Sequence, residues 1–118
     1  MKLRIQGNSL RLRVTQKEVA QLRDAGRVES SVELTPGRPL LYALESSRRI
    51  TAVTADFCDC TVHVSIPTNL VAEWAGSDQV GIEGRSQSGA QLLVEKDFQC
   101  LHQAAQGDPD AYPNPLMS

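Results

Sequence analysis

Short segments that alternate apolar and polar residues, joined by brief turns, recur along most of this 118-residue chain. The first occupies residues 2–14, where Gly7 and Asn8 separate two alternating arms. Such alternation places one face of a β-strand against a core, and a turn rich in Gly and Asn reverses the chain. Because antiparallel strands can be joined by such short turns, the pattern predicts hairpins and a largely antiparallel sheet.

Further strands are predicted downstream of this first hairpin. The stretch from Ile50 to Ile66 exceeds a typical strand, so it is predicted to fold as a hairpin that bends near Asp56 to Asp59. The other predicted strands run through residues 28–34, 40–44, 80–85 and 90–100. Their connections are shorter than the helical crossovers of a dinucleotide-binding fold, which the pattern therefore disfavours.

Thr15 to Glu18 is the clearest signal for the start of a helix. The four residues form a capping box, in which Thr15 and Glu18 each accept a hydrogen bond from the backbone amide of the other. Gly26 is a suitable residue for ending the helix in a left-handed conformation. A helix is therefore predicted over about residues 16–25.

A second, shorter helix is predicted to open at Pro67-Thr68, with Thr68 as its cap. Its inward residues are predicted to be Leu70, Val71 and Trp74. The expected fold class is α+β, with a bent antiparallel sheet or a partly open barrel and two short helices on one side. Residues 1–103 form the single predicted domain, and the polar, proline-rich residues 104–118 are predicted to be a loosely ordered tail.

The composition, with 41% apolar and 22% charged residues, favours a globular protein over a disordered one. The first fourteen residues alternate charged and apolar side chains, unlike a secretory signal. No window contains the ~20 apolar residues that span a bilayer. We therefore expect a cytoplasmic protein that makes no membrane contact. Cys58, Cys60 and Cys100 are an odd number of cysteines, which we expect to be reduced.

The two halves of the sequence have opposite charge. Residues 1–49 carry ten Lys and Arg against five Asp and Glu, whereas residues 50–118 carry two against nine. One interpretation is that the basic half binds an anionic partner. The favoured interpretation is that the halves face each other within one domain, or pair head to tail in an oligomer.

Lys96 falls in the predicted inward row of Leu92 and Val94. A buried ammonium group is costly unless it is paired, and Glu95 and Asp97 are its neighbours. One hypothesis makes Lys96, Glu95 and Asp97 part of a site for a small anionic ligand. The favoured alternative is that the strand ends or bulges there and the Lys96 side chain extends to water.

The first hairpin has a basic face formed by Arg4, Arg11 and Arg13. Arginines contact phosphates, so these three are further candidates for binding an anion. Sites for single-stranded nucleic acid add stacking aromatic residues, and this hairpin has none. The sequence therefore disfavours nucleic acid, and a solvated or ion-paired face is the preferred interpretation.

The thiols suggest a second kind of site, for zinc or a softer metal. The possible ligands are Cys58, Cys60, Cys100 and His102. Zinc knuckles have a longer gap than the single residue between Cys58 and Cys60. As part of the row that contains Val62, Cys60 is expected to point into the core, with His63 on the other face. No metal site and no cofactor are predicted, and a soft-metal or thiol site stays a minor alternative.

Several segments together carry a resemblance that covers nearly the whole chain. They are KLRIQGNSLRLRVTQKEV (Lys2 to Val19), SIP with the helix that ends at Trp74, VGIEG (Val80 to Gly84), VEKDFQCL (Val94 to Leu101) and DPDAYPNP (Asp108 to Pro115). These segments resemble a family of short bacterial proteins catalogued as a domain of unknown function. The resemblance implies a bacterial, cytoplasmic, stand-alone domain, and it implies no activity.

No familiar catalytic motif is present. The sequence contains neither GxGxxG nor GxxxxGK[ST], and His63 and His102 lack the spacing of a zinc protease. We therefore expect a non-catalytic binding or interaction module, whose partner is another protein or a second copy. The alternative is a binding protein or enzyme for a small phosphorylated or carboxylated molecule, which would use Lys96 and the hairpin arginines. The second alternative is the soft-metal or thiol site.

Overall fold

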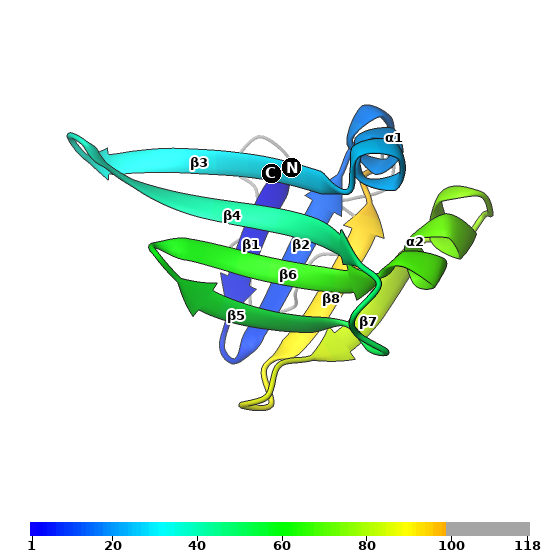
Figure 1. Ribbon diagram of the computed structural model, residues 1–118. Helices are drawn as coiled ribbons and strands as arrows, with labels where there is room; N and C mark the ends of the chain where they lie inside the picture. Colours follow the sequence, from blue (N-terminus) through cyan, green and yellow to red (C-terminus); the bar gives the residue numbers. More distant parts are fainter. Residues whose placement is uncertain (99–118) are drawn as a thin grey trace, which may run out of the picture.

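Two four-stranded sheets and two helices make up the computed structural model, which describes residues 1–98 (Figure 1). Sheet A contains β1 (Lys2–Gln6), β2 (Ser9–Val14), β7 (Gly81–Arg85) and β8 (Gln91–Lys96). Sheet B contains β3 (Arg27–Thr35), β4 (Arg38–Ser47), β5 (Thr54–Cys58) and β6 (Thr61–Pro67). The helices are α1 (Gln16–Ala25) and α2 (Thr68–Ala75). The predicted tail, Cys100 and His102 lie outside the described residues.

Each sheet consists of two hairpins that lie side by side. The strand order is β1-β2-β8-β7 in sheet A and β3-β4-β6-β5 in sheet B. The hairpin strands are antiparallel, as predicted, but the two central pairs, β2 with β8 and β4 with β6, are parallel. The α+β class with two short helices is confirmed, and within residues 1–98 the sheets do not close into a barrel.

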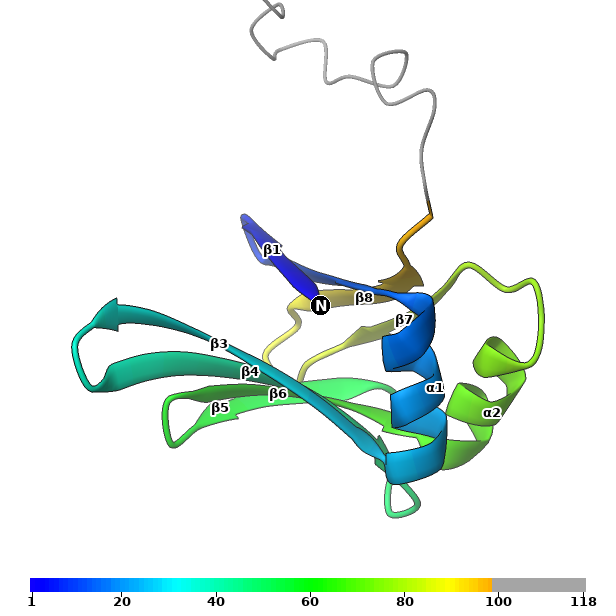
Figure 2. The same ribbon diagram turned by 90° about the horizontal axis from the view of Figure 1, so that it is seen from above.

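The hydrophobic core lies between the inner faces of the two sheets. Figure 2 shows the sheets one above the other, with both helices at one end of the pair. Sheet A contributes Leu12, Val14, Ile82, Leu92 and Val94, and sheet B contributes Val28, Leu44, Val64 and Ile66. The helices add Val19, Leu22, Val71 and Trp74. Neither helix of residues 1–98 has the length and apolar character needed to cross a membrane.

Helix α1 begins and ends where the sequence predicts. Thr15 Oγ1 accepts a hydrogen bond from the Glu18 amide at 3.3 Å, and Glu18 Oε1 accepts one from the Thr15 amide at 2.9 Å. This is the predicted capping box. At the other end Gly26 has a φ of 83°, a left-handed conformation that favours glycine, and its amide donates to Leu22 O.

Helix α2 starts as predicted but is capped differently. Pro67 is the cap residue, and the helix has no side-chain cap, so the prediction that Thr68 caps it is wrong. The Thr68 hydroxyl instead lies 2.9 Å from the Ser46 hydroxyl on β4, and this contact joins the helix to sheet B. Trp74 is fully buried as predicted, and its Nε1 donates to Val80 O at 3.1 Å.

The turn between β5 and β6 corrects one prediction. Asp59 and Cys60 both have positive φ angles, 52° and 57°, so these two residues make the turn. The bend therefore lies at the end of the predicted region. Cys60 is exposed and does not point into the core, because the β6 strand starts only at the next residue.

Candidate functional site

The outer face of sheet A carries mostly polar side chains, and neither α1 nor α2 covers it (Figure 2). The strand register aligns its side chains in rows that cross all four strands. The central row contains Arg4, Arg11, Leu93 and Glu83. The row on one side of it contains Lys2, Arg13, Glu95 and Gly81. The row on the other side contains Gln6, Ser9, Gln91 and Arg85. Two pairs of like charges, Lys2 with Arg13 and Arg4 with Arg11, are therefore direct cross-strand partners.

Three arginines on this surface line one hollow of about 420 Å³. Arg4 comes from β1, Arg11 from β2 and Arg85 from β7. The other polar residues in its lining are Gln6, Ser9, Glu83 and Gln91. We call this region the arginine hollow. It offers three guanidinium groups and two amides as hydrogen-bond donors, whereas the Ser9 hydroxyl donates to Gln6 O at 2.8 Å.

Glu95 neutralises part of the charge beside the arginine hollow. Arg13 Nε donates to Glu95 Oε1 at 2.8 Å, and Arg11 Nε lies 2.9 Å from the same oxygen. Although this second distance is short, buried Arg11 Nε has no hydrogen-bond partner among residues 1–98, so its N–H is not aimed at the oxygen. The Glu95 carboxylate thus pairs with two guanidinium groups, and its interaction with Arg11 is electrostatic, without a hydrogen bond from Nε.

Arg4 and Arg85 are not neutralised in the same way. Among residues 1–98, no ion pair involves either of them. Glu83, which is exposed, is the acidic residue that lines the hollow. The arginine hollow therefore keeps an excess of positive charge.

The candidate residues named from the sequence separate into two groups. Arg11, Arg13 and Glu95 lie together on the outer face of sheet A. Asp97 pairs with Lys2 at 3.0 Å, just beyond the end of β8. Neither acidic neighbour pairs with Lys96 within the described part of the chain.

Lys96 lies on the opposite side of β8, towards the helices. Its Nζ donates to Ser77 O at 2.7 Å and lies 5.9 Å from the centre of the Trp74 ring. Alternation along the strand explains this position, because Lys96 follows Glu95 directly. Lys96 and the arginines therefore cannot contact the same small ligand in this structure.

Comparison with known proteins identifies the family. The sequence profile of a family of unknown function, DUF7009, matches residues 1–116. The chain belongs to this family. The resemblance noted in the sequence to a domain of unknown function is thereby confirmed. No curated protein and no solved structure matches the chain.

Arg85 is the member of the arginine hollow that the sequence did not indicate. It lines the same hollow as Arg4 and Arg11 because β8 pairs in parallel with β2 and carries β7 beside it. The alternation around Ile82 places Arg85 away from the core, but only the pairing of the two hairpins places it near the other arginines.

Only two of the four residues of the alternative thiol site lie within the described residues. Cys58 and Cys60 are both exposed at the turn between β5 and β6. Cys100 and His102 lie outside the described residues, so the grouping of three thiols stays a minor alternative.

Proposed function

We propose that this protein is a non-catalytic binding module and that the arginine hollow binds a small phosphorylated or carboxylated molecule. The observation that carries this proposal is the convergence of Arg4, Arg11 and Arg85 on one hollow. The expected partner is an oxyanion, because a guanidinium group donates two parallel hydrogen bonds to phosphate or carboxylate oxygens.

The size and chemistry of the hollow support a small ligand. Its volume of about 420 Å³ is within the usual range for small-molecule sites, about 300–1,000 Å³. Gln6 and Gln91 can donate to, or accept from, hydroxyl groups beside the anionic group. Among the described residues, Ser9 is the hydroxyl-bearing residue of the lining, and its Oγ donates to Gln6 O rather than to a base, so the lining favours binding over catalysis.

The cross-strand repulsion between Arg4 and Arg11 also favours an anion. Like charges directly opposite each other destabilise a sheet. The Glu95 carboxylate is shared between Arg11 and Arg13, so it neutralises the charge of Arg11 only in part. An oxyanion bound between the guanidinium groups of Arg4 and Arg11 would therefore relieve their repulsion. Binding should therefore raise the stability of sheet A.

Thermal unfolding with inorganic phosphate or a phosphorylated sugar tests the proposal, with sodium chloride at the same ionic strength as reference. We expect phosphate to raise Tm more than chloride does. The increase should fall in Arg4→Gln and in Arg85→Gln. Lys96→Met is the matched control, since it removes a positive charge outside the hollow and should leave the increase intact. An increase that is equal in all variants would show general screening of charge and reject the hollow.

A second candidate function is self-association, which a group of exposed apolar residues favours. Val32 and Leu34, with exposures of 42% and 78%, lie near the end of β3, and Figure 2 shows that the β3–β4 hairpin projects beyond sheet A. β3 is also an edge strand of nine residues. A second copy fits this surface, because two identical edges can pair about a two-fold axis and cover both apolar groups.

The oligomeric state tests this second candidate. Light scattering across a range of concentrations should show a dimer for the wild type and a weaker dimer for Leu34→Ser. Val80→Ser is the control, since Val80 is similarly exposed at 52% but lies outside the hairpin. A monomer at every concentration, at low and moderate salt, would exclude self-association.

A further inference from the structure

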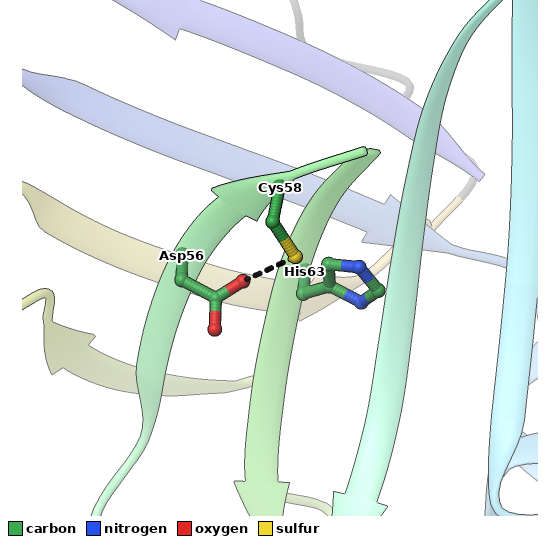
Figure 3. Close-up of side chains that lie close together, drawn as sticks. All are labelled: Asp56, Cys58 and His63. Carbon is green, nitrogen blue, oxygen red and sulfur yellow. Dashed lines mark hydrogen bonds between the residues drawn. The ribbon is translucent and has the colours of Figure 1, made fainter. Parts of the chain in front are cut away.

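Asp56, Cys58 and His63 lie together on the outer face of sheet B (Figure 3). Asp56 and Cys58 are two residues apart on β5, so their side chains share one face. The antiparallel register places His63 of β6 directly opposite Asp56 and diagonal to Cys58. Three side chains of different chemistry are thus brought together by two paired strands, next to the turn that joins them.

The three side chains are close enough to share one ion. A ligand atom from each lies within 4.8 Å of those from the other two. Cys58 Sγ lies 3.9 Å from Asp56 Oδ1, and both residues are exposed (Figure 3). Zinc binds sulfur at about 2.3 Å and nitrogen or oxygen at about 2.0 Å, so two ligand atoms of a tetrahedral site lie about 3.5 Å apart. Rotations of the exposed Asp56 and Cys58 side chains would bring their ligand atoms to this distance from each other and from His63.

Glu45 of β4 holds the imidazole ring of His63. Its Oε1 lies 3.1 Å from His63 Nδ1, and the same carboxylate pairs with Arg27. With Nδ1 protonated and donating to Glu45, Nε2 of the neutral ring keeps a lone pair for a metal. In zinc sites, a carboxylate commonly accepts a hydrogen bond from the other ring nitrogen of a histidine ligand and so fixes the orientation of its ring.

The charge around Cys58 is negative. The carboxylates of Asp56 and Glu45 lie on the same face of sheet B, and Asp59 follows Cys58 directly in the turn. These negative charges attract a cation, and a bound metal ion would stabilise the Cys58 thiolate directly.

We propose that Asp56, Cys58 and His63 bind one divalent ion of the zinc type, with water in the fourth position. Sulfur, nitrogen and oxygen ligands together suit zinc better than magnesium or calcium, which prefer oxygen alone. On binding, the Cys58 thiol loses its proton to solvent and the thiolate forms the bond to the metal. The site is separate from the arginine hollow, which is on the other sheet, and its test does not depend on anion binding.

Cobalt(II), which replaces zinc and is coloured, gives the first test. Titration of the protein should produce a sulfur-to-cobalt charge-transfer band that saturates at one ion per chain, and zinc should remove it. The background is Cys100→Ser, so that the third cysteine cannot contribute. Cys58→Ser should abolish the band, whereas Cys60→Ser, the matched control at the next exposed cysteine, should keep it. Absence of the band in the background protein, or its loss in Cys60→Ser alone, overturns the proposal.

Zinc affinity, measured by competition with a coloured chelator, tests the other residues. His63→Gln and Asp56→Asn should each weaken binding by at least tenfold, with the fold checked by circular dichroism. Glu45→Gln, which alters the positioning residue, should weaken binding about 10–100-fold and still keep the cobalt–sulfur band. Unchanged affinity in folded His63→Gln would reject the site. If that variant does not fold, unchanged affinity in Asp56→Asn rejects it instead.

Discussion

Arg4 and Arg11 are direct cross-strand partners on β1 and β2, so two guanidinium groups lie side by side on the outer face of sheet A. Lys2 and Arg13 repeat this relationship two residues away. Two carboxylates offset part of this positive charge: Glu95 pairs with Arg11 and Arg13, and Asp97 pairs with Lys2. The sheet thus keeps a repulsive pair at the centre of the arginine hollow.

Arg4→Gln should stabilise the protein without any ligand. Removing one of two like charges that face each other is expected to raise the free energy of unfolding by about 0.2–1 kcal/mol. Urea denaturation at low salt measures this change, which should shrink at high salt because ions screen exposed charges. Arg4→Lys is the control and should show little gain. A variant less stable than the wild type at low salt would mean that Arg4 has a stabilising partner.

Gly84→Ala should destabilise the contact between β7 and the segment that leads into β5. A Cβ atom at this position would lie 2.5 Å from Val53 Cβ and 2.8 Å from Val53 O, and Val53 is part of the core. Overfilling of this kind costs about 1–3 kcal/mol, which chemical denaturation can measure. Gly76→Ala serves as comparison, since its nearest atom is 3.3 Å away and the cost should be smaller. Equal stability of Gly84→Ala and wild type would contradict the close approach.

Lys96→Met should alter the surroundings of Trp74 while leaving the arginine hollow unchanged. The substitution removes the hydrogen bond to Ser77 O and the contact of the ammonium with the indole ring. A loss of about 0.5–1.5 kcal/mol is expected for these partly exposed interactions. Trp74 is the only tryptophan, so its fluorescence reports the change directly. Loss of phosphate-dependent stabilisation in this variant would instead place Lys96 at the anion site.

Glu18 should contribute to the loss of folding stability of the protein at acidic pH. Burial acts to raise the pKa of its carboxyl, but the Met1 ammonium and the Thr15 amide outweigh burial and lower the pKa below the ordinary 4.5. A lowered native pKa stabilises the fold above the unfolded value, and this contribution is lost as pH falls through the native pKa.

Glu18→Gln keeps the amide contact to Thr15 and removes the charge, so it isolates this effect. The wild type should be more stable than the variant near pH 6, and the difference should narrow as the pH falls below about 4.5. Thermal unfolding across this range gives the comparison. A difference that stays constant with pH would show that the ionised carboxylate contributes nothing.

Local features of the fold could be predicted because short segments determine them. Thr15, Glu18 and Gly26 specify both ends of α1 through contacts within a few residues. The Gly7-Asn8 turn, whose Gly7 has a φ of 54°, likewise defines the β1–β2 hairpin. Each of these depends on backbone conformation and on immediate neighbours, which the residue types reveal.

The arrangement of the hairpins could not be predicted in the same way. Periodicity shows which side of a strand faces the core, but it does not show which distant strand lies beside it. Arg85 therefore gave no sign that it joins Arg4, and His63 gave none that it lies near Cys58. Cys60 was placed wrongly because the alternation of β6 was extended one residue into a turn.

The order of strands has a consequence for how the chain folds. Sheet B is made from one uninterrupted stretch, residues 27–67, whereas sheet A joins the first hairpin to β7 and β8. Arg13 and Glu95, which bond across the central pair of sheet A, are 82 residues apart. Closing so long a loop costs more entropy than closing the short turns of sheet B. We expect sheet B to form first on the ribosome, and the arginine hollow to form only after β8 has paired with β2. A ligand of the hollow would therefore bind only fully synthesised and folded chains.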